Sequence, residues 1–501
     1  MNTVMRSNVA VSNSNLAQLD DSIGRPSYDR AQTMPRLVHI GAGGFNRSHL
    51  AVYLDDLLGM AAEPRWGEVA VGLLPPDREI HVGLASQDHL YSLLQMESGH
   101  ERLQVVGSLV EHLYAPDQTE AVLARMAAAE CAIISLTVTE GGYFIEDATG
   151  RFLSENVDVH HDLQHSDAPV TWLGYVAETA ERRRTLGRGP FTVLSCDNLQ
   201  GNGAIARRAL MAFAELRGGG LTQWIERNVT FPCSMVDRIT PRTTPQNRAP
   251  ILERFGVVDR APVVCEPFRQ WVLEDDFAAG RPAFEHVGVE MTSDVAPYEK
   301  MKMRILNGGH STLGYFADLL GIGFIHEAAT DDQLRRLLVA YMDEVKPVVP
   351  SLPGIDLDLY AATVVQRFSN TAIRDQVPRI CSEGCAKIAK FLVPPLADLL
   401  RAGNMPRILP LVIAGWLHYQ RGVDEQSRAM IMADAQAALL KPFVEAGCVN
   451  ARLVLVEPAV FGSLAAEFPA WASRVQQYLE LLRARGVRST IASVLNGAVA
   501  P

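Results

Sequence analysis

The stretch Leu37-Val-His-Ile-Gly-Ala-Gly-Gly-Phe-Asn-Arg-Ser-His49 decides the fold expected for this chain. A short apolar run ends at the glycine turn Gly41-Ala-Gly43-Gly44, and helical periodicity follows from His49 to Leu58. A glycine turn between a strand and a helix lets backbone N–H groups approach a pyrophosphate. Asn46 stands where the G-x-G-x-x-G pattern has its third glycine, so a tight structural turn is the alternative interpretation.

Strands and helices alternate beyond this turn. The expected strands are 68–73, 132–138, 191–194 and 228–231, and the expected helices are 118–129, 173–186 and 203–216. Such alternation predicts βαβ units and a doubly wound sheet. After about residue 297 nearly every segment is helix-like, namely 299–320, 331–345, 358–368, 385–402, 408–420, 427–444 and 470–485.

The expected fold class is therefore an α/β Rossmann-type N-terminal domain followed by an all-helical C-terminal domain. Residues 1–30, rich in Asn and Ser, are expected to form a flexible N-terminal tail. Residues 31–297 are expected to form the dinucleotide-binding domain, and residues 298–501 the helical substrate and catalytic domain. Ligands of open α/β sheets bind beyond the carboxyl ends of the strands, so polar residues at those ends are candidates for the site.

Composition narrows the classes of partner. The 501 residues are 48% hydrophobic and 21% charged, which is ordinary for a globular protein, and the net charge is −11. An acidic chain argues against nucleic acid or an anionic membrane as the main partner. No apolar run reaches the ~20 residues that span a bilayer, and the N-terminus lacks the apolar core of a secretory signal. We expect a cytoplasmic protein, a monomer or a weak oligomer, whose partner is a small molecule.

The seven cysteines are best explained as reduced thiols. Their number is odd, and they are scattered at positions 131, 196, 233, 265, 381, 385 and 448. The one tight pair, Cys381-x3-Cys385, lacks a second pair of cysteines or histidines at zinc-ligand spacing. No metal is expected.

A polar cluster begins at the predicted domain junction. At ~100° per helical residue, with Lys302 at 0°, Glu299 falls at about 60°, His310 at about 80° and Asn307 at about 140°. The four side chains thus share an arc of roughly 140° on one side of the helix. Gly308-Gly309 would let a ligand or a neighbouring backbone come close. An exposed polar helix face is the alternative, but the surrounding apolar residues and the domain junction favour a ligand site.

Two further features bear on the cofactor. Asp77 follows the second strand, where a carboxylate can bond the adenosine ribose and repel a 2′-phosphate. This favours NAD over NADP, although Arg78 could hold that phosphate and a solvated loop carboxylate is the alternative. Tyr298-x3-Lys302 matches the Tyr-x3-Lys pair of short-chain dehydrogenases, but those proteins are about half this length and place their glycine turn differently, so that assignment is rejected.

The sequence resembles the polyol-specific long-chain dehydrogenases/reductases, or mannitol dehydrogenase family, from about Leu37 to the C-terminal region. The resemblance rests on segments 39–49, Thr137-Val-Thr-Glu-Gly-Gly-Tyr143, Cys196-Asp-Asn198, Met235-Val-Asp-Arg-Ile-Thr-Pro241, Cys265-Glu-Pro-Phe268, Gln270-Trp-Val-Leu-Glu-Asp275 and Pro297-Tyr-Glu299. Above all, the chain has Lys302-x4-Asn307-x2-His310, the family's catalytic signature. Asn46, Ser48 and Leu50 depart from the family's usual residues in the glycine-turn segment.

The resemblance implies zinc-independent hydride transfer between NAD(P) and a secondary alcohol. Lys302 is then the general base, Asn307 and Asn198 polarise the reacting oxygen, His310 holds a substrate hydroxyl and Glu299 relays the proton. The implied cofactor-binding residues are Gly41, Gly43, Gly44, Phe45, Arg47, Asp77, Val236 and Asp237. Arg379 and Lys387 are implied to line the substrate pocket. A base at this position needs its pKa lowered from ~10.4, a shift favoured by burial and opposed by Glu299.

The implied reaction is the interconversion of D-mannitol and D-fructose with NAD, with NADP also possible. The segments 265–284, 353–357 and 367–370 are most similar to family members that oxidise mannitol at C2. Oxidation of D-arabinitol at C4 is an alternative within the same family. Reduction of a hexuronate such as fructuronate is another, and Arg374, Arg379 or Lys387 would then hold the carboxylate. A non-enzymatic NAD-binding regulator would have no need for the lysine cluster.

Overall fold

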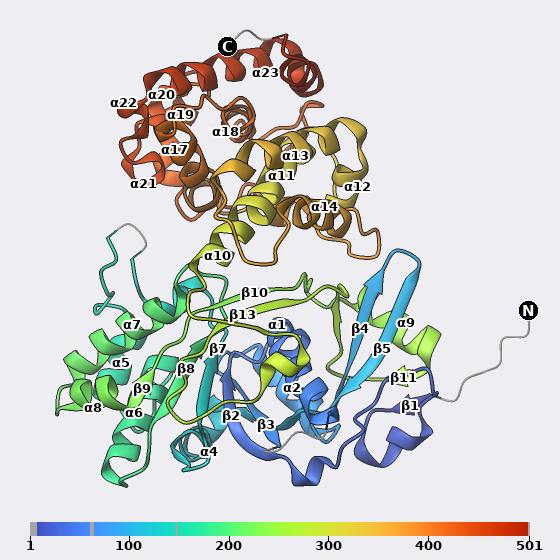
Figure 1. The fold of residues 1–501 in the computed structure, drawn as a ribbon, viewed down its shortest axis with the longest axis vertical. Helices are drawn as coiled ribbons and strands as arrows, with labels where there is room; N and C mark the ends of the chain where they lie inside the picture. Colours follow the sequence, from blue (N-terminus) through green and yellow to red (C-terminus); the bar gives the residue numbers. More distant parts are fainter. Residues whose placement is uncertain (1–7, 61–64, 147–148, 499–501) are drawn as a thin grey trace, which may run out of the picture. The chain divides into compact units, whose positions relative to one another are not determined.

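The computed structural model describes residues 8–60, 65–146 and 149–498 of the chain. They divide into two compact units, Met1–Ala296 and Pro297–Pro501, which we call unit 1 and unit 2 (Figure 1). Unit 1 contains the β-sheets, and unit 2 is built from helices. The α/β class expected for the first part of the chain and the helical class expected for the second are both confirmed.

A six-stranded sheet forms the centre of unit 1, with the strand order β6-β3-β2-β7-β8-β9. Its strands are β2 (Met34–Ile40), β3 (Trp66–Gly72), β6 (Leu109–Tyr114), β7 (Ile133–Leu136), β8 (Phe191–Ser195) and β9 (Val229–Thr230). All neighbouring pairs are parallel. Numbered along the chain this is the order 3-2-1-4-5-6 of the Rossmann fold, and strand order reverses between β2 and β7.

Helices cover both faces of this sheet (Figure 1). The helices of unit 1 are α1 (Gly44–Ser48), α2 (Leu50–Gly59), α3 (Asp77–Ala85), α4 (Ala115–Ala127), α5 (Val157–Gln164), α6 (Trp172–Thr185), α7 (Asn202–Arg217), α8 (Leu221–Asn228) and α9 (Pro245–Phe255), of which α9 packs away from this sheet, against β11 (Val257–Val258). Val38 and Ile40 of β2 belong to the core shared with α4, α6 and α7, whereas Leu37 belongs to the core shared with α2. Burial on both faces explains why the strands read as continuous apolar runs.

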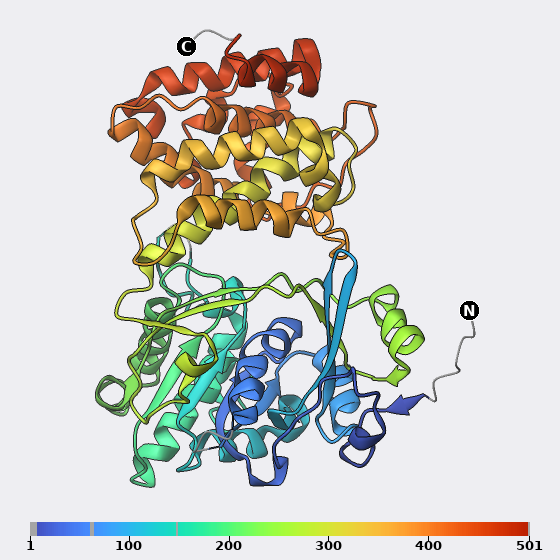
Figure 2. The same cartoon turned by 45° about the vertical axis from the view of Figure 1, so that its right-hand side comes forward.

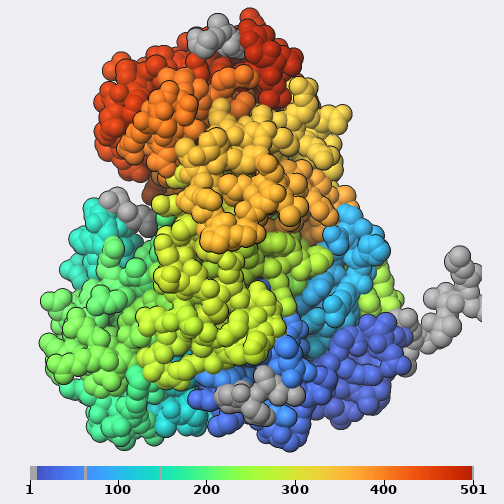
Figure 3. All heavy atoms as spheres, in the orientation of Figure 1, coloured from blue at the N-terminus to red at the C-terminus, as the bar shows by residue number. Residues whose placement is uncertain are grey.

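Three smaller sheets were not predicted from the sequence. The hairpin β4 (Tyr91–Glu97) and β5 (His100–Val106) pairs with β12 (Val263–Cys265), and Figure 2 shows it as two long blue strands. A second sheet joins β10 (Ser234–Asp237), β13 (Gln270–Glu274) and β14 (Glu290–Thr292). The segment with η4 (Phe284–Val287) and β14 packs over Trp271 and appears in yellow-green on the near face of unit 1 (Figure 3).

The flexible tail expected over residues 1–30 is wrong for the described residues 8–30. Strand β1 (Val9–Ala10) pairs with β11 (Val257–Val258), and the 3₁₀ helices η1 (Asn13–Gln18) and η2 (Arg30–Gln32) follow. Val11, Leu19 and Ile23 are buried in a cluster with residues of β4 and β5. These widely spaced apolar residues show no period, which is why the sequence did not reveal their packing. Residues 1–7 lie outside the described part of the chain.

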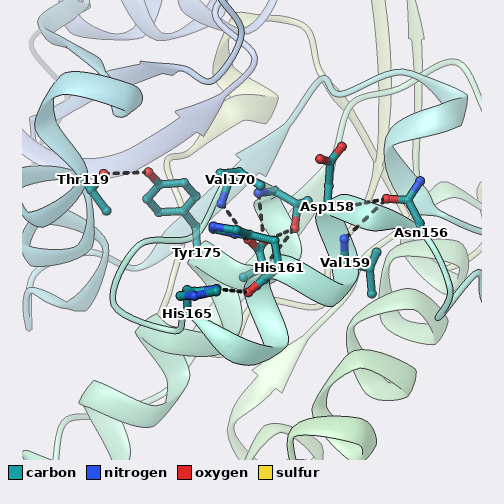
Figure 4. A network of polar contacts seen from close by, with 11 residues as sticks. Thr119, Asn156, Asp158, Val159, His161, His165, Val170 and Tyr175 are labelled. Atoms are coloured by element: carbon teal, nitrogen blue, oxygen red, sulfur yellow. Dashed lines mark hydrogen bonds and ion pairs between the residues drawn. The ribbon is translucent and has the colours of Figure 1, made fainter.

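The connection between α5 and α6 is fixed by a buried carboxylate. Asp162 accepts hydrogen bonds from the Val170 N–H (2.8 Å), from the Thr171 N–H (2.9 Å) and from the Thr171 hydroxyl (2.6 Å). Figure 4 shows this network together with Asn156, whose side chain caps the start of α5. A buried carboxylate is stable when several donors surround it, so this network holds the two helices together.

Unit 2 contains long helices around a buried one. Its main elements are α10 (Ala296–Lys302), η5 (Met303–Asn307), α11 (Gly308–Leu319), α12 (Ile325–Thr330), α13 (Asp332–Val345), α14 (Leu357–Phe368), α15 (Val377–Cys381), α16 (Gly384–Lys387), η7 (Ile388–Leu392), α17 (Val393–Arg401), α18 (Ile408–Tyr419) and α23 (Pro469–Leu495). Every residue of α18 is buried, and α11, α13 and α23 pack around it. In the described part of the chain, no helix combines the length and apolarity needed to cross a membrane.

The helix expected over 427–444 is wrong in its first half. Residues before Ala437 form turns, and helical structure consists of η8 (Ala437–Leu440) and α19 (Lys441–Glu445). The Asp424 carboxylate accepts the N–H groups of Gln426 and Arg428 and the Arg428 guanidinium. Such local side-chain bonds favour a turn over a helix. Short helices α20 (Arg452–Leu455), α21 (Pro458–Phe461) and α22 (Leu464–Glu467) lead to α23.

Candidate active site

Gly41 closes the turn at the switch point of the sheet. Its φ is +97°, and a Cβ there would lie 2.0 Å from the carbonyl oxygen of Thr137, which follows β7. The Thr137 hydroxyl donates to the Gly41 carbonyl (2.6 Å), and the buried His39 ring lies between that hydroxyl and Ser135. Burial lowers the pKa of His39 to about 3, so the ring is neutral. Only glycine fits position 41 without displacing the neighbouring strand end.

Gly43 and Gly44 have a different surrounding from Gly41. A Cβ at Gly43 would meet nothing closer than 3.8 Å, and one at Gly44 nothing closer than 3.6 Å. Their backbone therefore leaves room that a ligand can fill, as the pyrophosphate of a dinucleotide does in this kind of turn. Gly43 caps α1, and Phe45 in that helix stacks on His49 with ring centroids 4.9 Å apart.

The residues that depart from the family turn are buried beneath it. Asn46 donates to the Glu68 carboxyl (2.5 Å), and the Ser48 hydroxyl contacts that of Thr240 (2.8 Å). Burial raises the pKa of Glu68 to about 7. Asn46 and Ser48, which differ from the family's usual residues, thus support the turn from beneath through their contacts with Glu68 and Thr240.

Arg47 supports the glycine turn. Its guanidinium is buried, donates to the carbonyls of Ala261 and Gly43, and lies over the Tyr91 ring. The Tyr91 hydroxyl in turn donates to the Arg47 carbonyl (2.6 Å). The structure therefore gives Arg47 a positioning contact to Gly43, and direct contact with a cofactor stays a prediction.

Asp77 lies just beyond β3, as the sequence predicted. It begins α3, and its carboxylate accepts the Leu74 N–H (2.9 Å). Burial raises the pKa of Asp77, and the hydrogen bond from Leu74 opposes that rise. Its neighbour Arg78 is exposed, pairs with Asp117 (2.7 Å) and lies 4.7 Å above the Tyr114 ring. Arg78 thus already has an acidic partner, and contact of Asp77 with a ribose stays a prediction.

The loops after β7 and β8 are tied together by Asp197. Its carboxylate accepts the N–H groups of Val138 and Thr139 and the Tyr143 hydroxyl (3.0, 2.9 and 2.6 Å). Burial raises the pKa of Asp197 despite these donors. Asn198 follows at the carboxyl end of β8 with an exposed side chain. Sequence analysis did not select Asp197 as a site residue, although it holds both loops in place.

Val236 and Asp237 end strand β10, beside the glycine-turn segment. Both are buried, and they pair in register with Trp271 and Gln270 of β13. The next residue, Arg238, donates to the carbonyls of Glu266 and Ser48, and His49 contacts the Gln270 carbonyl (3.0 Å). The sheet of β10, β13 and β14 thus contacts the end of α1, at Ser48 and His49.

The polar cluster of unit 2 lies on a helix that changes type within the site. Glu299 and Lys302 end α10 and are buried, at 3% and 6% exposure, and Asn307 and His310 are half-buried. Between them, η5 is a π-helix. One extra residue in a turn delays the following side chains by about 100°, which moves Asn307 to about 40° and His310 to about −20° from Lys302. The arc of the four side chains therefore narrows from roughly 140° to roughly 80°.

Neighbouring segments contact His310 and Arg304 of this helix. The His310 ring stacks on Phe368 of α14, with centroids 3.9 Å apart and planes 17° apart. Arg304, within η5, pairs with Asp398 (2.6 Å) and donates to the Val348 carbonyl. Among the described residues, the buried Asn307 Oδ1 finds no hydrogen-bond partner, which leaves this oxygen open to a donor from a ligand.

Arg379 and Lys387 lie close together in unit 2. Arg379 makes a two-bond ion pair with the buried Asp375 (2.8 and 2.6 Å). The Lys387 ammonium donates to the carbonyls of Ile380 (2.9 Å) and Arg379 (3.3 Å). Burial and the nearby Arg379 lower the pKa of Lys387. Contact of either residue with a substrate stays a prediction.

Comparison with known proteins places the chain in a family. Residues 35–286 match the model of the mannitol dehydrogenase Rossmann domain, and residues 294–482 match that of the mannitol dehydrogenase C-terminal domain. The chain belongs to the mannitol dehydrogenase family. The expected resemblance is thereby confirmed.

Curated relatives and solved structures of this family resemble the chain over most of its length. Mannitol 2-dehydrogenase of Aspergillus fumigatus is 41% identical, over 87% of this chain and 88% of the relative. Mannitol 2-dehydrogenase of Phaeosphaeria nodorum is 40% identical, over 95% and 84%. The ternary complex of Pseudomonas fluorescens mannitol 2-dehydrogenase with NAD and D-mannitol matches with a TM-score of 0.89 and 40% identity, over 97% and 99%. Substrate-free D-sorbitol dehydrogenase matches with a TM-score of 0.88 and 36% identity, over 96% and 100%.

Some residues of this family member hold other parts of the candidate site in place, and the sequence pattern did not reveal them. Asp197 and Asp375 fix a loop and a cation, and Tyr341 contacts the helix that carries Lys302. The pair Gly308-Gly309 gave a partial signal, since it predicted a close approach by a ligand or backbone. The structure shows instead that side chains of α13 come close, namely the Tyr341 hydroxyl at Gly308 and Leu338 and Met342 at Gly309.

Proposed function

We propose that this chain is an NAD-dependent polyol dehydrogenase that interconverts D-mannitol and D-fructose, with Lys302 as the general base. The observation that carries this proposal is the polar helix face gathered by the π turn, on which Glu299 and Lys302 are buried and Asn307 and His310 are half-buried. Membership of the mannitol dehydrogenase family and the 40% identity to a mannitol 2-dehydrogenase solved with NAD and D-mannitol support it.

The residues of unit 1 fit a dinucleotide. A Cβ at Gly43 or Gly44 would occupy space that the protein leaves open, at the switch point where Rossmann folds bind pyrophosphate. Bound NAD supplies the acceptor for the hydride that leaves C2 of the alcohol. Asp77 would bond the ribose, and Val236 and Asp237 would lie against the nicotinamide. The zinc-independent chemistry expected from the sequence then needs a protein base.

The side chains of unit 2 would manage the proton. Lys302 in its neutral form takes the proton from the C2 hydroxyl as the C2–H bond breaks, so the oxygen becomes a carbonyl. The amide groups of Asn307 and Asn198 donate to that oxygen and stabilise the charge that develops on it. His310, held flat by Phe368, would bond a neighbouring hydroxyl. Glu299 would pass the proton from Lys302 towards solvent.

The contacts of the cationic side chains disfavour a hexuronate substrate. Arg379 is neutralised by Asp375, and Lys387 is committed to backbone carbonyls. Arg374 lies 4.3 Å above the Phe324 ring. A substrate carboxylate would have to displace one of these contacts, which an uncharged polyol does not require.

A substrate panel tests the proposal. The purified protein is assayed with D-mannitol, D-arabinitol, D-sorbitol, D-fructose and fructuronate, each with NAD(H) and NADP(H), with and without prior dialysis against a strong chelator. We expect the highest kcat/KM with D-mannitol and NAD, unchanged by the chelator. A higher value with D-arabinitol, D-sorbitol or fructuronate would contradict the substrate, and loss of activity that zinc restores would contradict the base.

A further inference from the structure

The π turn in the catalytic helix needs support from outside the helix. π-Helical residues make up well under 1% of globular proteins, because the wide i→i+5 turn packs less well than an α turn. Here η5 spans Met303–Asn307, so it begins directly after the signature residue Lys302 and ends at the signature residue Asn307. A wide turn also displaces the amide donors by one residue, so a carbonyl within it requires another donor.

Tyr341 of α13 supplies that donor. Its hydroxyl donates to the carbonyl of Arg304, which lies inside η5, over 2.7 Å. The Tyr341 side chain is fully buried, so water cannot take its place at this carbonyl. Burial also raises the pKa of Tyr341 far above its ordinary value, which keeps the hydroxyl protonated as a donor.

Gly308 provides the space for this contact. A Cβ at position 308 would lie 1.9 Å from the Tyr341 hydroxyl oxygen and 2.8 Å from Cζ. The φ of Gly308 is −65°, a value open to any residue, so the glycine is needed for space and not for its backbone freedom. The tyrosine and the glycine therefore form one contact, made by residues 33 positions apart on two helices.

We propose that Tyr341 is a positioning residue, whose hydroxyl keeps the π turn open so that Asn307 and His310 share the face of Lys302. The inference rests on the proposed function, because it concerns the same reaction. Without the hydroxyl, the segment relaxes towards a regular α-helix, which rotates Asn307 and His310 by about 100° around the helix axis relative to Lys302. The lysine then keeps its place while the groups that hold the substrate lose theirs.

Tyr341→Phe tests the inference, with Tyr419→Phe as the matched control. Tyr419 is also buried in unit 2, and its hydroxyl also donates to a backbone carbonyl, that of Ile431 (3.0 Å). We expect Tyr341→Phe to lower kcat for polyol oxidation roughly 10- to 100-fold, as misplacement by about an ångström does. The Kd for NAD should stay within twofold of wild type. Tyr419→Phe should leave kcat within twofold, even where both variants lose similar thermal stability.

Hydrogen–deuterium exchange gives a readout that does not depend on activity. The amides of 303–310 should exchange faster in Tyr341→Phe than in wild type, and at the wild-type rate in Tyr419→Phe. Gly308→Ala is the second variant, since its methyl group would displace the hydroxyl. Because Tyr341→Phe and Gly308→Ala break one contact, the double variant should lose no more kcat than the worse single variant.

The outcomes separate this inference from the proposed function. If the wild-type protein oxidises no polyol, the proposed function fails, and the exchange rates alone decide whether Tyr341 holds the turn. If the wild type is active and Tyr341→Phe keeps its kcat within twofold, the inference is overturned while the function stands. Unchanged exchange over 303–310 in both Tyr341→Phe and Gly308→Ala would overturn it as well.

Discussion

Lys302 sits in surroundings that distinguish it from the other cations of its segment. It is buried, whereas Lys300 on the same helix is exposed. Arg304, a further cation of this segment, pairs with Asp398 (2.6 Å).

Lys302→Ala should abolish most polyol oxidation while leaving NAD binding within twofold of wild type. General-base catalysis contributes ~10²–10⁴-fold, so kcat should fall by that factor. Steady-state kinetics and NAD titration by fluorescence measure the two effects, and added primary amines should restore part of the rate. Lys300→Ala is the control and should be near wild type. A Lys302→Ala variant with more than half the wild-type rate would disprove the role.

Asp77→Ala should erode the preference for NAD, mainly by improving NADP binding. The carboxylate lies just past β3, and Arg78 next to it is already paired with Asp117. Removing the repulsion between a carboxylate and a phosphate should shift discrimination by about tenfold, or ~1.4 kcal/mol. Kinetic constants for both cofactors decide the matter. Glu79→Ala, which removes an exposed carboxylate of the same helix, should leave the ratio unchanged, and a wild type that prefers NADP would contradict the placement of Asp77.

At the scale of elements, two short segments with unusual backbones position the site. The glycine turn depends on one residue with positive φ, Gly41, which packs against the end of β7. The π turn depends on a tyrosine from α13. The first was readable in the sequence because glycines mark it, and the second was not, because Tyr341 lies 37 residues downstream of Arg304 on another helix.

The same contrast explains which elements the sequence predicted. Strands β2, β3, β7 and β8 are buried on both faces, so they form continuous apolar runs that stand out. The hairpin of β4 and β5 was missed, since its mixed polar and apolar residues gave a weaker pattern and its stability comes from pairing with the distant β12. The four-residue polar face was predicted from spacing alone, whereas its narrowing required the π turn.

Two glycine variants should separate the structural role of the turn from its role in binding. Gly41→Ala would force a Cβ to within 2.0 Å of the Thr137 oxygen, so it should lower the thermal stability of unit 1 severely. Gly43→Ala places its Cβ in open space, so the Tm should stay within about 2 °C of wild type, a shift worth ~1 kcal/mol at most. If a pyrophosphate occupies that space, Gly43→Ala should still weaken NAD binding by tenfold or more. Unchanged NAD affinity in Gly43→Ala would contradict the cofactor site.

At the scale of the whole molecule, unit 1 contains buried histidines and buried carboxyls whose titrations change the stability of the fold in opposite directions. Burial lowers the pKa values of His39, His49 and His112 to about 3 each. The unfolded chain binds a proton at such a histidine before the folded protein does. Each of these histidines therefore makes its full contribution to the free energy of unfolding above the ordinary pKa of ~6.5, and this contribution falls by ~1.4 kcal/mol per pH unit below it. Burial raises the pKa of Asp55 to about 6 and that of Glu68 to about 7, and these carboxyls oppose the loss down to ~4.5.

Glu68→Gln isolates one of these titrations. The folded protein holds Glu68 protonated below about pH 7, whereas the unfolded chain ionises it above ~4.5, so the wild type loses stability as the pH rises between these values. A glutamine keeps the hydrogen bond from Asn46 without titrating. The variant should therefore be more stable than wild type at pH 8, and this advantage should shrink by ~1.4 kcal/mol per pH unit from pH 7 towards 4.5. Calorimetric unfolding of both proteins at several pH values measures the difference. Glu97→Gln, which changes an exposed carboxylate on β4, should follow wild type throughout, and a Glu68→Gln advantage that stays constant with pH would show that Glu68 does not titrate in this range.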